Sequence, residues 1–222
     1  MIPPTVGPIV GFTTSQHARI FVRGELDKNN AVFAGIRHRK AGDSQWSAGV
    51  FSRLSPEFDM SDTLVLNTLH SDTRYEYQAG WFATSSPGHT PETVKQIALQ
   101  WPATVYTFKT DSTARNRTRR YVTGSCRYLR LTAGIPSAAH LGDEIFASIH
   151  ALARQQGLDA VVMTGDQVYV DDLNILAPDS DYPATTPKPH PPSTHPHIRS
   201  LLAPPPTYMI LDDHEIEDNW PA

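Results

Sequence analysis

Short runs of alternating apolar and polar residues, separated by polar turns, make up the first half of the chain. They lie at residues 18–23, 31–37, 46–51, 63–69, 75–82 and 105–110. Alternation with a period of two places one side of a strand in a core and the other in solvent, so each run predicts a half-buried β-strand. The pattern therefore predicts a β-sandwich domain over residues 1–110.

One spacing in this half is more specific. Leu69 lies six residues before Tyr75, which resembles the tyrosine corner of fibronectin type III domains, where a phenol bonds back to the backbone. Strand propensity alone explains why Tyr75 and Tyr77 are tyrosines, but it does not explain the spacing. We therefore expect a fibronectin III-like β-sandwich, and we assign no catalytic role to it.

The second half has a different pattern. Residues 158–164 and 207–211 form apolar runs typical of short strands, and residues 119–123 form another plausible strand. Residues 143–156, between the strands at 119–123 and 158–164, have apolar positions at helical spacing. A strand, helix and strand in this order form a parallel pair with a right-handed crossover. The predicted fold class is α+β with two domains, the second being the first part of an α/β sandwich at residues 119–222.

Two segments carry neither pattern. Residues 111–119 are polar and basic, which favours a linker between the domains, with anion binding as the alternative. Residues 178–206 are rich in proline and have too little apolar content to fold alone, so we predict an extended loop. Its histidines offer metal ligands, but proline disfavours a regular ligand geometry. A short helix is expected at residues 197–202, before the last strand.

Potential metal ligands follow all three strands predicted in the second half. Cys126 comes after the first strand, Asp166 after the second, and an Asp-Asp-His-Glu run at residues 212–215 after the third. In open α/β sheets, sites form beyond the carboxyl ends of the strands, so these side chains are expected to converge. Three carboxylates and an imidazole in four positions favour a bound cation, with an acidic helix start as the alternative.

Composition narrows the classes of function. A net charge of −4 gives no signature of nucleic-acid binding. The single cysteine excludes an intrachain disulfide, so Cys126 is either an inert thiol or a ligand. No segment approaches the roughly 18 apolar residues of a membrane span, and no signal peptide is visible. We expect a cytoplasmic protein with no membrane partner, exported only if an upstream segment is missing.

Three motifs in a fixed order point to a family. They are GSCR at residues 124–127, TGDQVYVDD at residues 164–172 and TYMILDDHEIEDNW at residues 207–220. Together they resemble the PhoD-type alkaline phosphatases, which belong to the calcineurin-like metallophosphoesterases. The opening segment at residues 7–14 and the run at residues 18–20 resemble the start of that family's β-sandwich domain. The resemblance covers nearly the whole chain apart from the proline-rich segment.

The resemblance implies a phosphoric ester hydrolase that acts on phosphate mono- or diesters with iron and calcium, through a metal-activated hydroxide. It implies that Cys126 and Tyr169 are thiolate and phenolate ligands of iron and that Asp166 bridges the metals. Thiolate and phenolate do suit a transition metal better than calcium. Asp213 falls where the superfamily has an asparagine ligand. His214 falls on the histidine that contacts phosphate or protonates the leaving group.

The remaining implied roles are less specific. Arg127 shares with His214 the stabilisation of charge on the phosphoryl oxygens. The acidic neighbours Asp171, Asp172 and Asp212 have no assigned role.

The superfamily fold continues beyond the motifs found here with further strands and late histidine and aspartate ligands. The chain is therefore expected to be C-terminally truncated, with a complementing C-terminal fragment as a possible partner besides the phosphate ester substrate. The alternatives are an inactive fragment or a non-catalytic β-sandwich binding module. Hydrolysis by a Cys126 nucleophile is a further alternative, but no paired base lies at a recognisable spacing.

Overall fold

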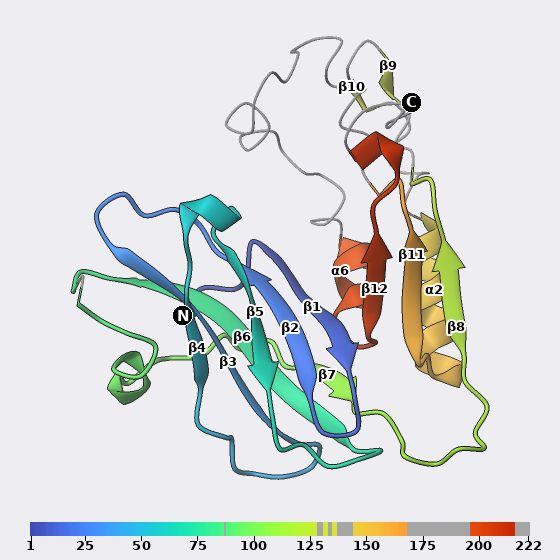
Figure 1. Cartoon of the computed structure of the whole chain (residues 1–222), viewed down its shortest axis with the longest axis horizontal. Coiled ribbons are helices and arrows are strands. Elements are labelled where there is room, and N and C mark those ends of the chain that lie inside the picture. The colour runs from blue at the N-terminus through green and yellow to red at the C-terminus, as the bar shows by residue number, and fades with distance from the viewer. Residues whose placement is uncertain (87, 128–130, 133–134, 137–143, 168–195, 216–222) are drawn as a thin grey trace. The chain divides into compact units, whose positions relative to one another are not determined.

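The computed structural model describes residues 1–86, 88–127, 131–132, 135–136, 144–167 and 196–215 (Figure 1). The chain divides into two compact units. The first contains Met1–Thr118 and Leu202–Pro206, and the second contains Arg119–Leu201 and Thr207–Ala222. Leu202–Pro206, which the sequence places in the proline-rich loop of the second domain, thus belongs to the first unit.

Two antiparallel sheets form the first unit (Figure 1). The three-stranded sheet has the order β1-β2-β5, formed by β1 (Val6–Thr13), β2 (Ala18–Arg23) and β5 (Ser61–Leu66). The four-stranded sheet has the order β4-β3-β6-β7, formed by β3 (Ala31–Lys40), β4 (Val50–Arg53), β6 (Arg74–Thr84) and β7 (Tyr106–Lys109). Two short 3-10 helices, η1 (Pro56–Phe58) and η2 (Val94–Gln96), lie in the connections.

Both sheets of the first unit contribute to one buried core. Ala18, Ile20 and Val22 of β2 are fully buried, while Arg19, between Ala18 and Ile20, is exposed. Val32 and Ala34 of β3 belong to the same cluster as the β2 residues. The alternation read from the sequence therefore gives the expected inward and outward faces, and the unit is a β-sandwich.

One predicted strand is displaced. The run at residues 46–51 is not a strand along its length, because β4 begins only at Val50. The ring of Trp46 lies against two guanidinium groups of β3, with its centroid 4.7 Å from Cζ of Arg37 and 4.3 Å from Cζ of Arg39. Trp46 thus makes cation–π contacts with charged side chains instead of alternating into the core.

Two tyrosines of β6 form hydrogen bonds with backbone groups outside their own strand. The phenolic oxygen of Tyr75 accepts a hydrogen bond of 2.8 Å from the N–H of His70, so the bond to the backbone predicted from the Leu69 spacing is present. The hydroxyl of Tyr77 donates to the carbonyl of Ala203 at 2.8 Å. Burial, with a smaller contribution from Tyr106, raises the pKa of the Tyr77 phenol well above its ordinary value, so it remains a donor.

A parallel sheet with the order β12-β11-β8 forms the centre of the second unit. Its strands are β8 (Tyr121–Gly124), β11 (Ala160–Thr164) and β12 (Thr207–Ile210). Helix α2 (Glu144–Gln156) lies between β8 and β11 in the chain, and Gly157 follows it with φ +76°. The parallel strand, helix and strand unit is thus confirmed.

The other elements of this unit are short. Helix α6 (Pro196–Leu202) precedes β12, and the 3-10 helix η3 (Asp213–Glu215) follows it. Strands β9 (Leu131–Thr132) and β10 (Ile135–Pro136) pair antiparallel. Within the described parts of the chain, none of the helices has both the length and the apolar character needed to cross a membrane.

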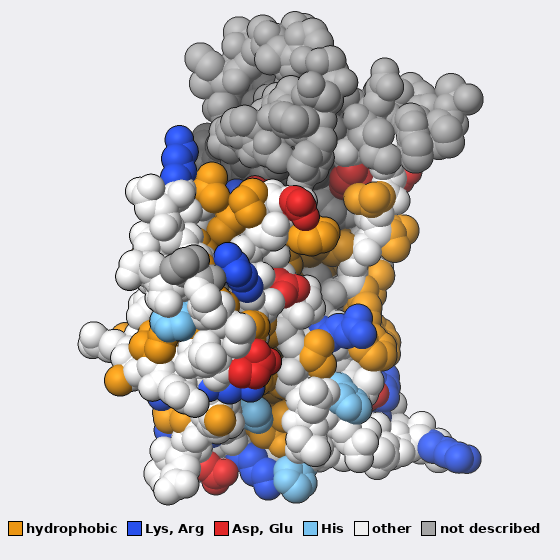
Figure 2. Space-filling view, turned by 60° about the vertical axis from the view of Figure 1, so that its left-hand side comes forward, with side chains coloured by type: hydrophobic (Ala, Val, Ile, Leu, Met, Phe, Trp, Pro, Cys, Tyr) orange, Lys and Arg blue, Asp and Glu red, His pale blue; other side chains and the backbone are white. Residues whose placement is uncertain are grey.

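Strand β12 is less covered than its neighbour β11. Val161 and Met163 of β11 are buried, whereas Met209 and Ile210 of β12 are 47% and 60% exposed and Leu211 beyond them is 71% exposed. Hydrophobic side chains also reach the surface among charged ones in the face shown in Figure 2. The sheet thus exposes apolar side chains along one edge strand.

Candidate metal centre

The register of the parallel sheet brings three strand ends to one edge. Met163 of β11 pairs with Gly124 of β8 on one side and with Met209 of β12 on the other. The loops that follow are joined by backbone hydrogen bonds: the N–H of Cys126 donates to the carbonyl of Gly165 at 3.2 Å, and that of Arg127 to the carbonyl of Asp166 at 2.7 Å. The residues after β8 and β11 are therefore held side by side.

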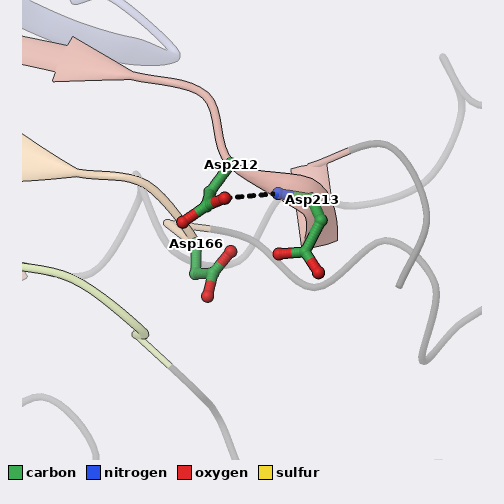
Figure 3. A group of neighbouring side chains, drawn as sticks. All are labelled: Asp166, Asp212 and Asp213. Atoms are coloured by element: carbon green, nitrogen blue, oxygen red, sulfur yellow. Dashed lines mark hydrogen bonds between the residues drawn. The ribbon is translucent and has the colours of Figure 1, made fainter. Parts of the chain in front are cut away.

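Three carboxylates meet at this edge (Figure 3). Each of Asp166, Asp212 and Asp213 offers an oxygen, and these oxygens lie within 4.8 Å of one another. Asp166 follows β11 and is 5% exposed, while Asp212 and Asp213 follow β12 and are exposed and half-buried. The N–H of Asp213 donates to Oδ1 of Asp212 at 3.1 Å. The predicted ligands Asp166 and Asp213 thus lie together, and Asp212 joins them.

Cys126 lies next to the acidic group. Its Sγ donates to Oδ2 of Asp166 at 3.2 Å. Cys126 and Asp166 both have left-handed backbones, with φ +57° and φ +55°. Residues other than glycine hold this conformation only where their surroundings impose it, and such residues gather at functional sites.

A glycine allows the β11 and β12 loops to approach. Gly165 has φ +98°, and a Cβ atom built on it would lie 2.4 Å from Cβ of Asp212. No real pair of side chains is that close, so the contact requires glycine at this position. Gly165 therefore sets the spacing between Asp166 and the acidic residues after β12.

The carboxylate of Glu215 also binds the loops that follow β11 and β12. It accepts hydrogen bonds from the N–H of Asp166 at 3.0 Å and from the N–H of Asp212 at 2.8 Å, and it also accepts from the N–H of Gln167. The bond to Asp212 is half of a capping box, in which an acidic residue at the third position of a helix binds the N–H of the N-cap residue. The Asp-x-x-Glu spacing at residues 212–215 is a signal from which this local bond could have been predicted.

The other predicted site residues fall into two groups. The guanidinium carbon of Arg127 lies 5.7 Å from the ring centroid of Phe146, a buried residue of α2, which gives the charged group an aromatic support. Tyr169 and the acidic neighbours Asp171 and Asp172 lie outside the described residues, as does the side chain of His214.

The described donors fit a metal ion. Carboxylate oxygens suit hard cations, and a thiol at the edge of the group extends the choice to transition metals. The three carboxylates repel one another, and a cation relieves that repulsion. Gln167, the residue after Asp166, has a buried side-chain oxygen and nitrogen with no hydrogen-bond partner in the described part of the chain. Buried polar groups usually have a partner, which protein groups or water supply in most cases.

No family model and no curated protein matches this chain. Among solved structures it is similar to PhoD, with a TM-score of 0.65 and 16% identity over 98% of this chain and 40% of that chain. The likeness shows a PhoD-like fold, and this chain spans 40% of the length of PhoD. A sensor domain of the anti-sigma factor RsgI4 of Pseudobacteroides cellulosolvens covers 53% of this chain and 97% of its own, at 15% identity and a TM-score of 0.31.

Proposed function

We propose that this chain carries the first part of a metallophosphoesterase site and that it takes part in the hydrolysis of phosphate mono- or diesters. The observation that carries the proposal is the group of Asp166, Asp212 and Asp213 with Cys126 beside it, at the carboxyl ends of parallel strands. The PhoD-like fold supports the same reaction class.

The proposed metals are iron and calcium. Cys126 and Tyr169 would bind iron as thiolate and phenolate, and Asp166 and Asp213 would supply carboxylate oxygens to the metals. When bound, the metals would supply a hydroxide nucleophile near neutral pH and neutralise phosphate charge. Asp212 lies close enough to the others to add a carboxylate.

The remaining proposed roles belong to groups that meet the substrate. Arg127 would bind a phosphoryl oxygen through its guanidinium group, which Phe146 supports from one side. His214, one residue after Asp213, would donate a proton to the leaving alcohol. An alcohol leaves more easily when protonated, so this step matters most for substrates with basic leaving groups.

The test measures bound metal and hydrolysis separately. The purified 222-residue chain is reconstituted with iron and calcium, analysed for metal content, and assayed with aryl phosphate mono- and diesters. We expect Asp166→Asn and Cys126→Ala to lower the metal content and abolish any hydrolysis, and we expect Asp43→Asn, in an exposed turn of the first unit, to change neither. Unchanged metal stoichiometry in both site variants would reject these ligand roles.

The span of 40% of PhoD makes one outcome especially informative. A chain that binds metal but does not hydrolyse either ester would support the alternative of an inactive fragment or a binding module. Hydrolysis that appears only when a complementing C-terminal fragment is added would instead support a site completed by that partner.

A further inference from the structure

We propose that Glu215 is a positioning residue of this centre, whose carboxylate fixes the β11 and β12 loops at the spacing at which Asp166, Asp212 and Asp213 converge. The proposal rests on the proposed metal function, but its first test does not depend on metal. Glu215 is not a member of the acidic group, whose oxygens lie within 4.8 Å of one another and come from Asp166, Asp212 and Asp213. A ligand role for Glu215 therefore does not follow from that group.

The two oxygens of the Glu215 carboxylate accept hydrogen bonds from both loops. Oε2 accepts from the N–H of Asp166 at 3.0 Å and from the N–H of Asp212 at 2.8 Å, so one oxygen bridges the two loops. Oε1 accepts from the N–H of Gln167. Bonds from N–H groups to a carboxylate are stronger than bonds to a neutral acceptor, so three of them hold the loops firmly.

The backbone of the β11 loop is shaped for this anion. Gly165 and Asp166 both have positive φ, at +98° and +55°. The consecutive N–H groups of Asp166 and Gln167 bind the same carboxylate, which is how backbone turns usually bind anions. Glu215 therefore supports the left-handed conformation of Asp166, and that conformation determines where the Asp166 carboxylate points.

Glu215 also connects loops that lie far apart in sequence. Backbone bonds join the loop after β8 to the loop after β11. Glu215 joins the loop after β11 to the loop after β12, across 49 residues from Asp166. All three strand ends are thus fastened to one another, with Glu215 as the link to the acidic residues after β12.

The first test is amide hydrogen exchange, measured by NMR on the full chain in the presence of a chelator. In Glu215→Ala, we expect the amides of Asp166, Gln167 and Asp212 to exchange about tenfold faster, because each loses its acceptor. Glu215→Gln should show a smaller effect, because an amide oxygen replaces one carboxylate oxygen while the NH2 group opposes the remaining donor.

Two results of this test would overturn the proposal. One is unchanged exchange at the three amides in Glu215→Ala. The other is equal acceleration in α2, which would show general loosening of the unit. Glu144→Ala, in the first turn of α2, is the matched control, and it should leave the three amides unchanged.

The second test is metal titration. We expect Glu215→Ala to lower the affinity about 10- to 100-fold at an unchanged number of bound ions, the usual effect of losing a group that orients ligands. Asp166→Asn should instead lower the number of ions bound. Fewer bound ions in Glu215→Ala would make Glu215 a ligand and overturn the positioning role. If the wild-type chain binds no metal, the proposed function fails, and the exchange experiment still decides the role of Glu215.

Discussion

Gly165 and Asp212 approach each other so closely that a Cβ atom at position 165 would lie 2.4 Å from Cβ of Asp212. The contact joins the end of β11 to the end of β12 at the place where the carboxylates meet. Gly157 offers a natural comparison, because its φ of +76° is also positive but a Cβ there would meet nothing within 4 Å.

Alanine substitution at these two glycines distinguishes the cost of a positive φ from the cost of steric overlap with Asp212. Gly157→Ala should lower the free energy of unfolding by about 1 kcal/mol, because alanine tolerates positive φ poorly. Gly165→Ala should cost about 1–3 kcal/mol more, because the added methyl group forces the two loops apart. Urea denaturation of both variants measures the difference, and equal losses would contradict the close contact.

Removing one carboxylate should change stability in opposite directions with and without metal. In chelator, Asp213→Asn is expected to leave the midpoint of thermal unfolding unchanged or raise it, because a repulsive charge is lost beside Asp166 and Asp212. With added metal, the rise in the midpoint seen in the wild type should shrink or vanish, because binding to the folded state stabilises it. A metal-induced rise as large as in the wild type would contradict a ligand role for Asp213.

The bond between Tyr75 and His70 should contribute measurably to the first unit. Tyr75→Phe leaves the N–H of His70 without its acceptor, so we expect a loss of about 1–2 kcal/mol in the free energy of unfolding. Tyr121→Phe is the control, because the Tyr121 side chain is 58% exposed, and a change within about 0.5 kcal/mol is expected there. Urea denaturation gives both values, and a silent Tyr75→Phe would show that the phenol does not act as the acceptor in solution.

His38 should make the first unit less stable in mild acid. Burial lowers the pKa of this imidazole, whose Nδ1 lies 3.1 Å from Oγ of Ser47. Below the unfolded-state pKa of about 6.5, the unfolded chain therefore takes up a proton that the folded chain resists. The stabilisation is complete above that pH and is lost as the pH falls through the lower folded-state value.

Denaturation curves between about pH 5 and 7.5 test this dependence around the unfolded-state pKa. His38→Gln should flatten the fall in stability relative to the wild type, because glutamine does not titrate. His17→Gln, in the exposed turn after β1, should keep the wild-type slope. Parallel curves for His38→Gln and the wild type would rule out a contribution from His38.

Elements whose local pattern agrees with the global fold could be predicted from the sequence. The alternation at residues 18–23 places Ile20 and Val22 in the core, as the structure has it. The convergence of Cys126, Asp166 and Asp213 followed from a general property of parallel sheets and needed no knowledge of side-chain positions. The ligand and catalytic roles of these residues and of Arg127, Tyr169 and His214 remain predictions.

Contacts between groups far apart in the chain could not be predicted from the sequence. The capping bond between Glu215 and Asp212 was readable from local spacing, but the bond from Glu215 to the N–H of Asp166 depends on how two loops meet in space. The alternation around Trp46 predicted a strand with this side chain in the core, but its ring lies against the guanidinium groups of Arg37 and Arg39. The hydrophobic pattern of the sequence does not distinguish an aromatic ring in the core from one that contacts charged groups.

The bond between Tyr77 and Ala203 also bears on the order of events during synthesis. Its partners are 126 residues apart, and Ala203 belongs to the same compact unit as Tyr77. The ribosome therefore synthesises β8, α2 and β11 before it reaches Leu202–Pro206, the last segment of the first unit. The N-terminal unit is finished only after most of the second unit has left the ribosome, so the two should mature together and not one after the other.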